Sequence, residues 1–141
     1  MVIGVGTDLI EIDRVEASIA RFGDRFLDRV FTPAEIAYCS LKKNSAESFA
    51  ARFAAKEAGA KALGTGISRG IGWKEIEVRR LPGHKPTLHW SGRAAERAHI
   101  LGVVSTELSL THSHTVALAV VILSGHATLE KPPRNQSQPS G

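Results

Sequence analysis

The chain has 141 residues, which is the usual size of one domain and is enough to bury a core without disulfide support. Its hydrophobic content of 43% and charged content of 23% exclude collagen-like, disordered and membrane-embedded classes of protein. Lys and Arg outnumber Asp and Glu by 18 to 14, which favours anionic partners without identifying them. Cys39 is the only cysteine, so no internal disulfide can form, and we expect a cytoplasmic protein.

The sequence shows neither a secretory signal nor a membrane span. The first segment, MVIGVGTDLIEID, carries acidic residues where a signal peptide needs basic residues and a longer apolar run. The longest apolar run, residues 116–123, is far shorter than the roughly 20 residues that cross a bilayer. We therefore expect no export and no membrane partner.

An N-terminal strand is predicted from the alternation of side chains over residues 2–10. One face carries Ile3, Val5, Thr7 and Leu9, and the other carries Gly4, Gly6 and Asp8. A carboxylate among glycines is costly to bury unless it is paired or bound to a metal. Asp8 therefore needs a partner. This partner could be a metal ion, but an aspartate on a strand more ordinarily pairs with an arginine or caps a turn.

Helices are predicted next. Asp13 with Glu16 resembles a capping box, and Thr32-Pro33 followed by Glu35 is a stronger helix start. The longest helix should begin at Asn44, continue through alanine-rich sequence to Ala62 and end at Gly64, with a length of roughly 30 Å.

This long helix carries a band of charged residues among its alanines. Arg52 and Lys56 lie four residues apart, as do Glu57 and Lys61. These residues could form a binding site, or they could form routine ion pairs on a helix face exposed to solvent. Asp8 and Glu57 could share a magnesium ion, because this ion takes one or two carboxylates together with water and phosphate oxygens. The three basic residues would then bind phosphate, which predicts a diphosphate site.

The remaining sequence predicts short strands and one helix. The segment Gly64–Gly66 follows the negative end of a helix, so it lacks the logic of a Walker or Rossmann phosphate loop. Strands are expected at 73–80 and 87–90, a helix at 92–101, and a hairpin from the runs 103–111 and 115–123.

The turn of that hairpin holds His112 and His114 around Ser113. Neither a zinc site nor a serine nucleophile fits, because no further ligand cluster or nucleophile elbow is present in the sequence. After residue 123 the composition becomes polar and proline-rich, so residues 1–123 should form the domain and 124–141 a disordered tail.

Two motifs, GTDLIEIDRV and FAARFAAKEAGAKALGTG, together resemble the signature of the holo-[acyl-carrier-protein] synthases, which are small 4'-phosphopantetheinyl transferases. The ending LSLTHSHTVALAVVIL is similar to the last hairpin of that family, so the resemblance covers residues 1–123. Two departures from the family pattern are Glu107, where histidine is frequent, and His84, where glycine is usual.

The resemblance implies an α+β fold in which an antiparallel sheet packs on a long central helix, and a homotrimer with active sites between subunits. It implies transfer of 4'-phosphopantetheine from coenzyme A to a serine of apo-acyl-carrier protein, with Mg²⁺ as cofactor and adenosine 3',5'-bisphosphate as product, in fatty-acid or polyketide synthesis. Asp8 and Glu57 match the metal ligands, and Asp8, Glu57 and Lys61 the catalytic residues. The coenzyme A contacts would be Arg52, Lys56, Lys61, Gly64, Thr65, Gly66, Pro86, His112 and Ser113.

Three arginines, Arg14, Arg21 and Arg25, are expected to bind the acidic carrier protein. They share one face if the first helix continues through Gly23, whereas a break at Gly23-Asp24 would separate them. Two other classes of function stay open on the sequence. The aromatic content of 6% and the lack of a binding motif disfavour a nucleic-acid-binding module. The retained carboxylates disfavour a catalytically silent subunit that only binds coenzyme A or the carrier.

Overall fold

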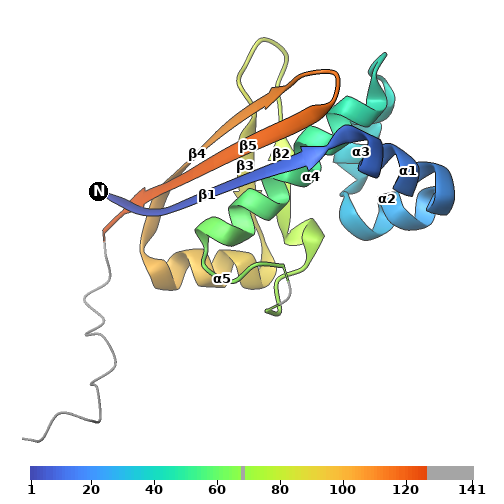
Figure 1. Ribbon diagram of the computed structural model, residues 1–141. Helices are drawn as coiled ribbons and strands as arrows, with labels where there is room; N and C mark the ends of the chain where they lie inside the picture. The colour runs from blue at the N-terminus through green and yellow to red at the C-terminus, as the bar shows by residue number, and fades with distance from the viewer. Residues whose placement is uncertain (68, 127–141) are drawn as a thin grey trace, which may run out of the picture.

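The computed structural model describes residues 1–67 and 69–126, which form an α+β fold (Figure 1). The helices are α1 (Ile12–Phe22), α2 (Asp24–Val30), α3 (Pro33–Ser40), α4 (Ser45–Ala62), the short 3-10 helix η1 (Trp73–Glu75) and α5 (Gly92–Leu101). The strands β1 (Val2–Glu11), β5 (Val116–Gly125) and β4 (Val103–His112) form an antiparallel sheet in that order. The strands β2 (Ile76–Arg79) and β3 (Thr87–Trp90) form a separate antiparallel pair.

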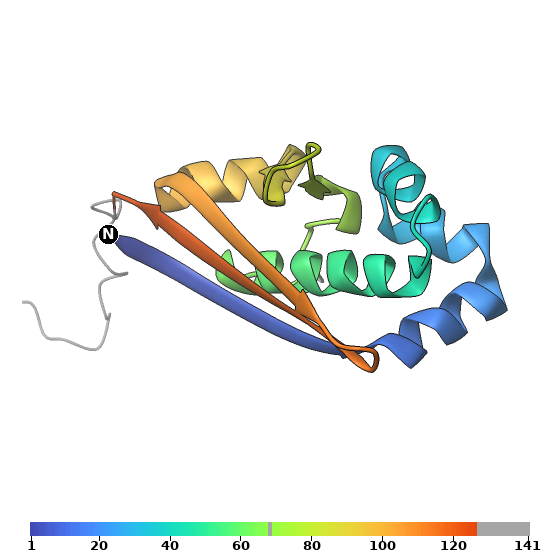
Figure 2. The same ribbon diagram turned by 90° about the horizontal axis from the view of Figure 1, so that it is seen from above.

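Helix α4 lies between the larger sheet on one side and α5 with the β2–β3 pair on the other (Figure 2). It approaches β1 closely because the facing strand positions are glycines. A Cβ atom on Gly6 would stand 1.8 Å from the carbonyl oxygen of Ala58, and one on Gly4 would stand 2.5 Å from that of Ala62. The predicted face of Gly4, Gly6 and Asp8 is therefore the face that packs on the helix.

The helix starts differ in how well the sequence predicted them. Thr32 and Glu35 form the predicted capping box, with Pro33 at the first helical position. The box predicted for Asp13 is wrong, because α1 begins at Ile12 and Asp13 lies in its first turn. The alternative of one helix continuing through Gly23 is also wrong, since this glycine has a φ of 56° and separates α1 from α2.

The other face of the three-stranded sheet is uncovered in the described part of this chain. It is largely apolar along β1 and β5, whereas β4 carries polar side chains on it. Val5 and Leu9 are 56% and 63% exposed. They are paired in register with Ile122 and Leu118 of β5, whose side chains are half-buried. In Figure 2, no described helix or strand lies over this side of the sheet. The chain thus leaves a hydrophobic surface open to a partner.

The last strand continues to Gly125, whose amide donates to the Met1 carbonyl over 3.0 Å. The predicted tail therefore begins inside β5, and its part from 127 to 141 lies outside the described residues. Among the helices of the described chain, none is both long and apolar enough to cross a membrane.

Candidate active site

Asp8, Glu57 and Lys61 come together where β1 crosses α4. Glu57 and Lys61 are four residues apart and share one face of the helix. The ammonium of Lys61 lies 3.0 Å from Oδ1 of Asp8 and also donates to the Thr7 carbonyl over 3.1 Å. Lys61 thus pairs with the strand carboxylate, which the spacing within the helix did not predict.

Glu57 lies close enough to Asp8 for the strand carboxylate to influence its protonation. Partial burial is the main cause that raises the pKa of Glu57, and the nearby negative charge of Asp8 raises it further, while Lys61 opposes both. A carboxylate with a raised pKa accepts a proton more readily near neutral pH than an ordinary glutamate does.

The donor set also fits a hard cation. Two carboxylates that repel each other at one edge are stabilised by a positive ion between them, and Mg²⁺ completes its shell with water and substrate phosphates. Within residues 1–67 and 69–126 there is no group of three His, Cys, Asp or Glu side chains that could hold a metal unaided. Such a site needs a ligand that brings oxygens of its own.

Arg52 is a buried cation without a carboxylate partner among the described residues. Its side chain is 5% exposed, its guanidinium stacks on the Tyr38 ring at 4.2 Å, and its Nε atom has no hydrogen-bond partner in the described chain. Lys42 lies over the same ring at 4.6 Å. Burial alone would raise the pKa of Tyr38, but Lys42 and Arg52 together lower it, which marks the positive potential of this corner.

His112 and Ser113 lie at the β4–β5 turn, near the start of α4. The Nδ1 atom of His112 is 3.5 Å from a carboxylate oxygen of Glu47, and His114 makes a similar contact with the other oxygen. The Ser113 hydroxyl accepts hydrogen bonds from the amides of Thr115 and Val116, both at 3.2 Å, and so stabilises the turn.

Lys56 lies in the interior and not at a ligand surface. It is 0% exposed, and its ammonium is 2.7 Å from Glu35 Oε1. It also donates to the carbonyls of Ile76 and Trp73 over 2.6 and 3.1 Å. These partners occupy the ammonium, so Lys56 reaches no ligand in this structure.

The remaining predicted contacts lie on different sides of the chain. Gly64–Gly66 directly follow α4. Pro86 stands before β3 and next to Lys85, which pairs with Glu107 of β4, so it lies toward the edge of the sheet opposite β1. Arg52 and Glu57 are five positions apart on the helix, so their side chains leave it about 140° apart. One chain therefore does not gather all the predicted residues on one surface.

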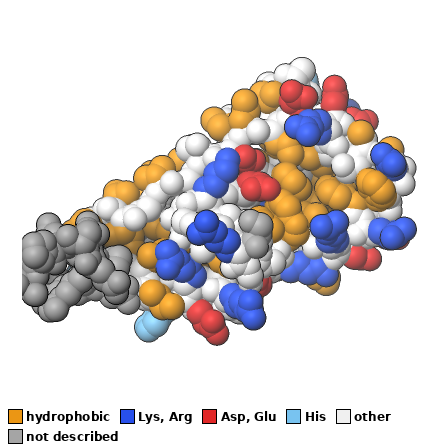
Figure 3. Space-filling view, turned by 60° about the horizontal axis from the view of Figure 1, so that its bottom comes forward, with side chains coloured by type: hydrophobic (Ala, Val, Ile, Leu, Met, Phe, Trp, Pro, Cys, Tyr) orange, Lys and Arg blue, Asp and Glu red, His pale blue; other side chains and the backbone are white. Residues whose placement is uncertain are grey.

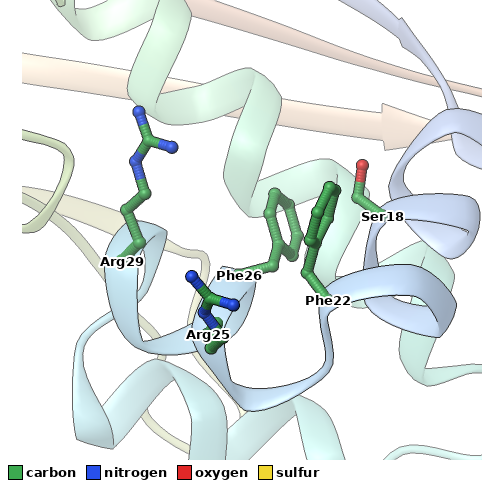
Figure 4. A pocket seen from close by; sticks show the side chains of 5 residues that line it. All are labelled: Ser18, Phe22, Arg25, Phe26 and Arg29. Atoms are coloured by element: carbon green, nitrogen blue, oxygen red, sulfur yellow. The ribbon is translucent and has the colours of Figure 1, made fainter.

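An apolar groove with arginines at its border runs along α1 and α2. Hydrophobic side chains gather in a strip on the face seen in Figure 3, and Lys and Arg side chains border it. A hollow of about 260 Å³ is lined by Ser18, Phe22, Arg25, Phe26 and Arg29. Figure 4 shows the rings of Phe22 and Phe26 side by side, with Arg25 and Arg29 extending from α2. An adjoining hollow shares Ser18 and Phe26 and includes Arg14.

Sequence reasoning missed three side chains of these clusters. The sequence predicts Glu35 only as part of a helix cap, and it singles out neither Glu47 nor Tyr38. Each contacts a residue far along the chain, and no spacing rule signals such a contact. The one signal that could have pointed to Tyr38 is the excess of basic over acidic residues around Arg52, because a cation without an acidic partner can stack on an aromatic ring.

A family model described as the 4'-phosphopantetheinyl transferase superfamily matches residues 4–121, and the chain belongs to this superfamily. The resemblance stated from the motifs is confirmed, and with it the assignment as an enzyme of the phosphopantetheinyl transferase type.

Within the superfamily, the chain is similar to the holo-[acyl-carrier-protein] synthases. The synthase of Koribacter versatilis is 52% identical over 87% of this chain and 98% of its own length. The solved synthase of Neisseria meningitidis has a TM-score of 0.80 at 30% identity, covering 88% of this chain and 99% of its own. That of Helicobacter pylori, solved with coenzyme A, has a TM-score of 0.75 at 32% identity, covering 85% of this chain and 99% of its own.

Proposed function

We propose that this chain transfers the 4'-phosphopantetheine group of coenzyme A to a serine of an apo-acyl-carrier protein, with Mg²⁺ bound by Asp8 and Glu57. The observation that carries the proposal is the meeting of Asp8, Glu57 and Lys61 where β1 crosses α4. The names of the similar proteins and the coenzyme A complex of one of them support the choice of substrates.

The reaction joins the serine oxygen to the β-phosphorus of coenzyme A and breaks the bond from that phosphorus to the departing adenosine 3',5'-bisphosphate. Glu57 takes the proton of the serine hydroxyl, directly or through one water, because it is a carboxylate beside the position proposed for the diphosphate. Lys61 leaves its contact with Asp8 to neutralise charge on the leaving group. The metal, when bound, neutralises and orients the diphosphate.

Arg52 is proposed to bind a phosphate of coenzyme A, and His112 and Ser113 are proposed to contact coenzyme A separately, from the β4–β5 turn. A buried guanidinium without a carboxylate is costly, and a phosphate would supply the missing charge and an acceptor for its Nε atom. This corner leaves α4 on a different side from Glu57. The phosphates would thus be divided between two surfaces of the chain.

Two surfaces of one chain can serve one coenzyme A if neighbouring copies face each other. The uncovered sheet face around Val5, Leu9 and Leu118 is suited to such an assembly, because apolar area of this kind is buried on association. We therefore propose a homotrimer with its active sites between subunits. Light scattering tests this point, and a monomer mass at micromolar concentration would refute it.

The arginine-bordered groove is proposed as the carrier-binding surface. Carrier proteins of this type are acidic. Arg14 and Arg25 line the two hollows and Arg21 lies over the Phe22 ring at 5.1 Å, so the three arginines provide the opposite charge. The break at Gly23 does not scatter Arg14 and Arg25, because both border the connected hollows. We place the activity in the cytoplasm, where the unpaired Cys39 stays reduced.

Calorimetric titration with coenzyme A, with and without Mg²⁺, tests the proposed site. We expect binding that tightens when the metal is present, and a loss of this metal effect in Asp8→Asn. Binding of coenzyme A that is indifferent to both changes would refute the metal site.

A further inference from the structure

The C-terminal end of α4 is an unfavourable place for an anion. This inference rests on the proposed function and on the resemblance to the synthases, which implies that coenzyme A lies against Gly64–Gly66, just after that end. The last carbonyls of a helix carry the negative pole of its dipole and repel phosphate within about one turn. A compensating positive charge is therefore needed.

Local backbone bonds satisfy part of this end. The amide of Gly64 donates to the Lys61 carbonyl over 2.9 Å. The amides of Thr65 and Gly66 donate to the Ala60 carbonyl over 3.2 and 3.1 Å. Because these amides point back into the helix, they do not point outward to a ligand as they would in a phosphate-binding loop.

Arg97 of α5 supplies the positive charge. Its Nε atom donates to the Leu63 carbonyl over 3.1 Å. Its guanidinium lies against Gly64, since Nη2 would be 3.8 Å from a Cβ atom placed on that glycine. Gly64 and Gly66 have φ angles of 79° and 62°, a conformation that favours glycine. Because glycine has no side chain, none stands between the arginine and an approaching ligand.

We propose that Arg97 determines anion binding at this end of α4. Its Nε–H neutralises the terminal carbonyl, and its remaining N–H groups, of the five that a guanidinium has, bind a phosphate of coenzyme A that lies against Gly64–Gly66. The alternative role is a purely structural helix cap, which would change stability and leave ligand affinity unaltered.

The test measures coenzyme A binding by calorimetry in three variants. Arg97→Met should weaken binding about tenfold, the scale of one charged hydrogen bond, and reduce its dependence on salt. Arg97→Lys keeps the charge and should recover part of the affinity. The Michaelis constant for the carrier should not change, since the groove on α1 and α2 is a separate surface.

Arg93→Met is the matched control. Arg93 lies one turn earlier on α5 and its guanidinium lies against Gly70, so this change removes the same charge away from Leu63 and Gly64. We expect the affinity for coenzyme A to stay within about threefold of wild type.

Two results would overturn the inference: Arg97→Met that binds coenzyme A within about twofold of wild type, or Arg93→Met that loses as much affinity as Arg97→Met. If Arg97→Met does not fold, Arg97→Glu or Arg97→Gln replaces it in the test. Coenzyme A affinity and salt dependence that equal those of wild type in either variant would also overturn the inference. A wild-type chain that neither binds coenzyme A nor modifies a carrier would instead refute the proposed function.

Discussion

Lys56 and Glu35 form an ion pair of 2.7 Å that is completely shielded from solvent. Glu35 also accepts hydrogen bonds from the amides of Thr32 and Val78, at 2.9 and 3.0 Å. The pair thus joins α3, α4 and β2. Burial lowers the pKa of Lys56, and the charge of Glu35 opposes this effect.

Removing one partner of this pair should be more harmful than removing both charges. Lys56→Met leaves a buried carboxylate unpaired, and we expect it to lower the free energy of unfolding by about 3–5 kcal/mol. The double variant Lys56→Met, Glu35→Gln should lose less than the sum of the single changes. Urea unfolding measures both, with the exposed Lys74→Met as control. A loss below about 1 kcal/mol in Lys56→Met would show that the pair is dispensable.

The close approach of β1 to α4 predicts that Gly6 tolerates no side chain. A Cβ atom there would stand 1.8 Å from the Ala58 carbonyl oxygen, so Gly6→Ala must push the strand that carries Asp8 away from Glu57. We expect a loss of at least about 2 kcal/mol of stability and a marked loss of transfer activity. Gly72→Ala is the control, because its Cβ would lie 3.4 Å from a flexible side chain. Equal melting temperatures for the two variants would be inconsistent with this packing.

The paired carboxylates should be essential for turnover but not for folding. We expect Asp8→Asn and Glu57→Gln each to reduce transfer by roughly two to four orders of magnitude. Because the folded pKa of Glu57 is raised, the folded chain binds more protons than the unfolded chain above the usual glutamate pKa. Its contribution to stability is therefore lost as pH rises through the folded pKa, and Glu57→Gln should remove this pH dependence. Near-normal turnover in either purified variant would refute the assignment.

Charge reversal in the groove should affect one substrate only. Arg14→Glu combined with Arg21→Glu should raise the Michaelis constant for the carrier and leave that for coenzyme A unchanged, because exposed charges steer an acidic partner. Wild-type carrier binding should weaken with salt, since screening acts over roughly 8 to 10 Å. Arg80→Glu on the β2–β3 turn is the control. Equal carrier affinity in wild type and the double variant at low salt would exclude this docking surface.

Local patterns in the sequence predicted a large part of the fold. The alternation around Asp8, the cap at Thr32 and the helix ending before Gly64 each depend on neighbours within a few residues, and all three are present in the structure. The predicted cap at Asp13 is wrong because tertiary contacts start α1 earlier: the Ile12 amide donates to the Thr115 carbonyl over 2.9 Å.

The candidate site was predictable to the extent that it lies on one helix face. Glu57 and Lys61 share that face, and Asp8 could be matched to them through its need for a partner. The interior position of Lys56 could not be predicted, because its partner Glu35 lies 21 residues away on another helix. The stacking of Arg52 on Tyr38 depends on how α3 packs on α4, which no periodicity encodes.

The most direct test of the account is the transfer reaction with the purified chain. Coenzyme A, Mg²⁺ and a bacterial apo-acyl-carrier protein are incubated with the chain, and the carrier is weighed by mass spectrometry. We predict that the carrier gains one phosphopantetheine on its serine, that one adenosine 3',5'-bisphosphate is released per carrier, and that chelation of the metal stops the reaction. An unchanged carrier mass, with a folded chain and several apo-carriers tried, would contradict the proposed function.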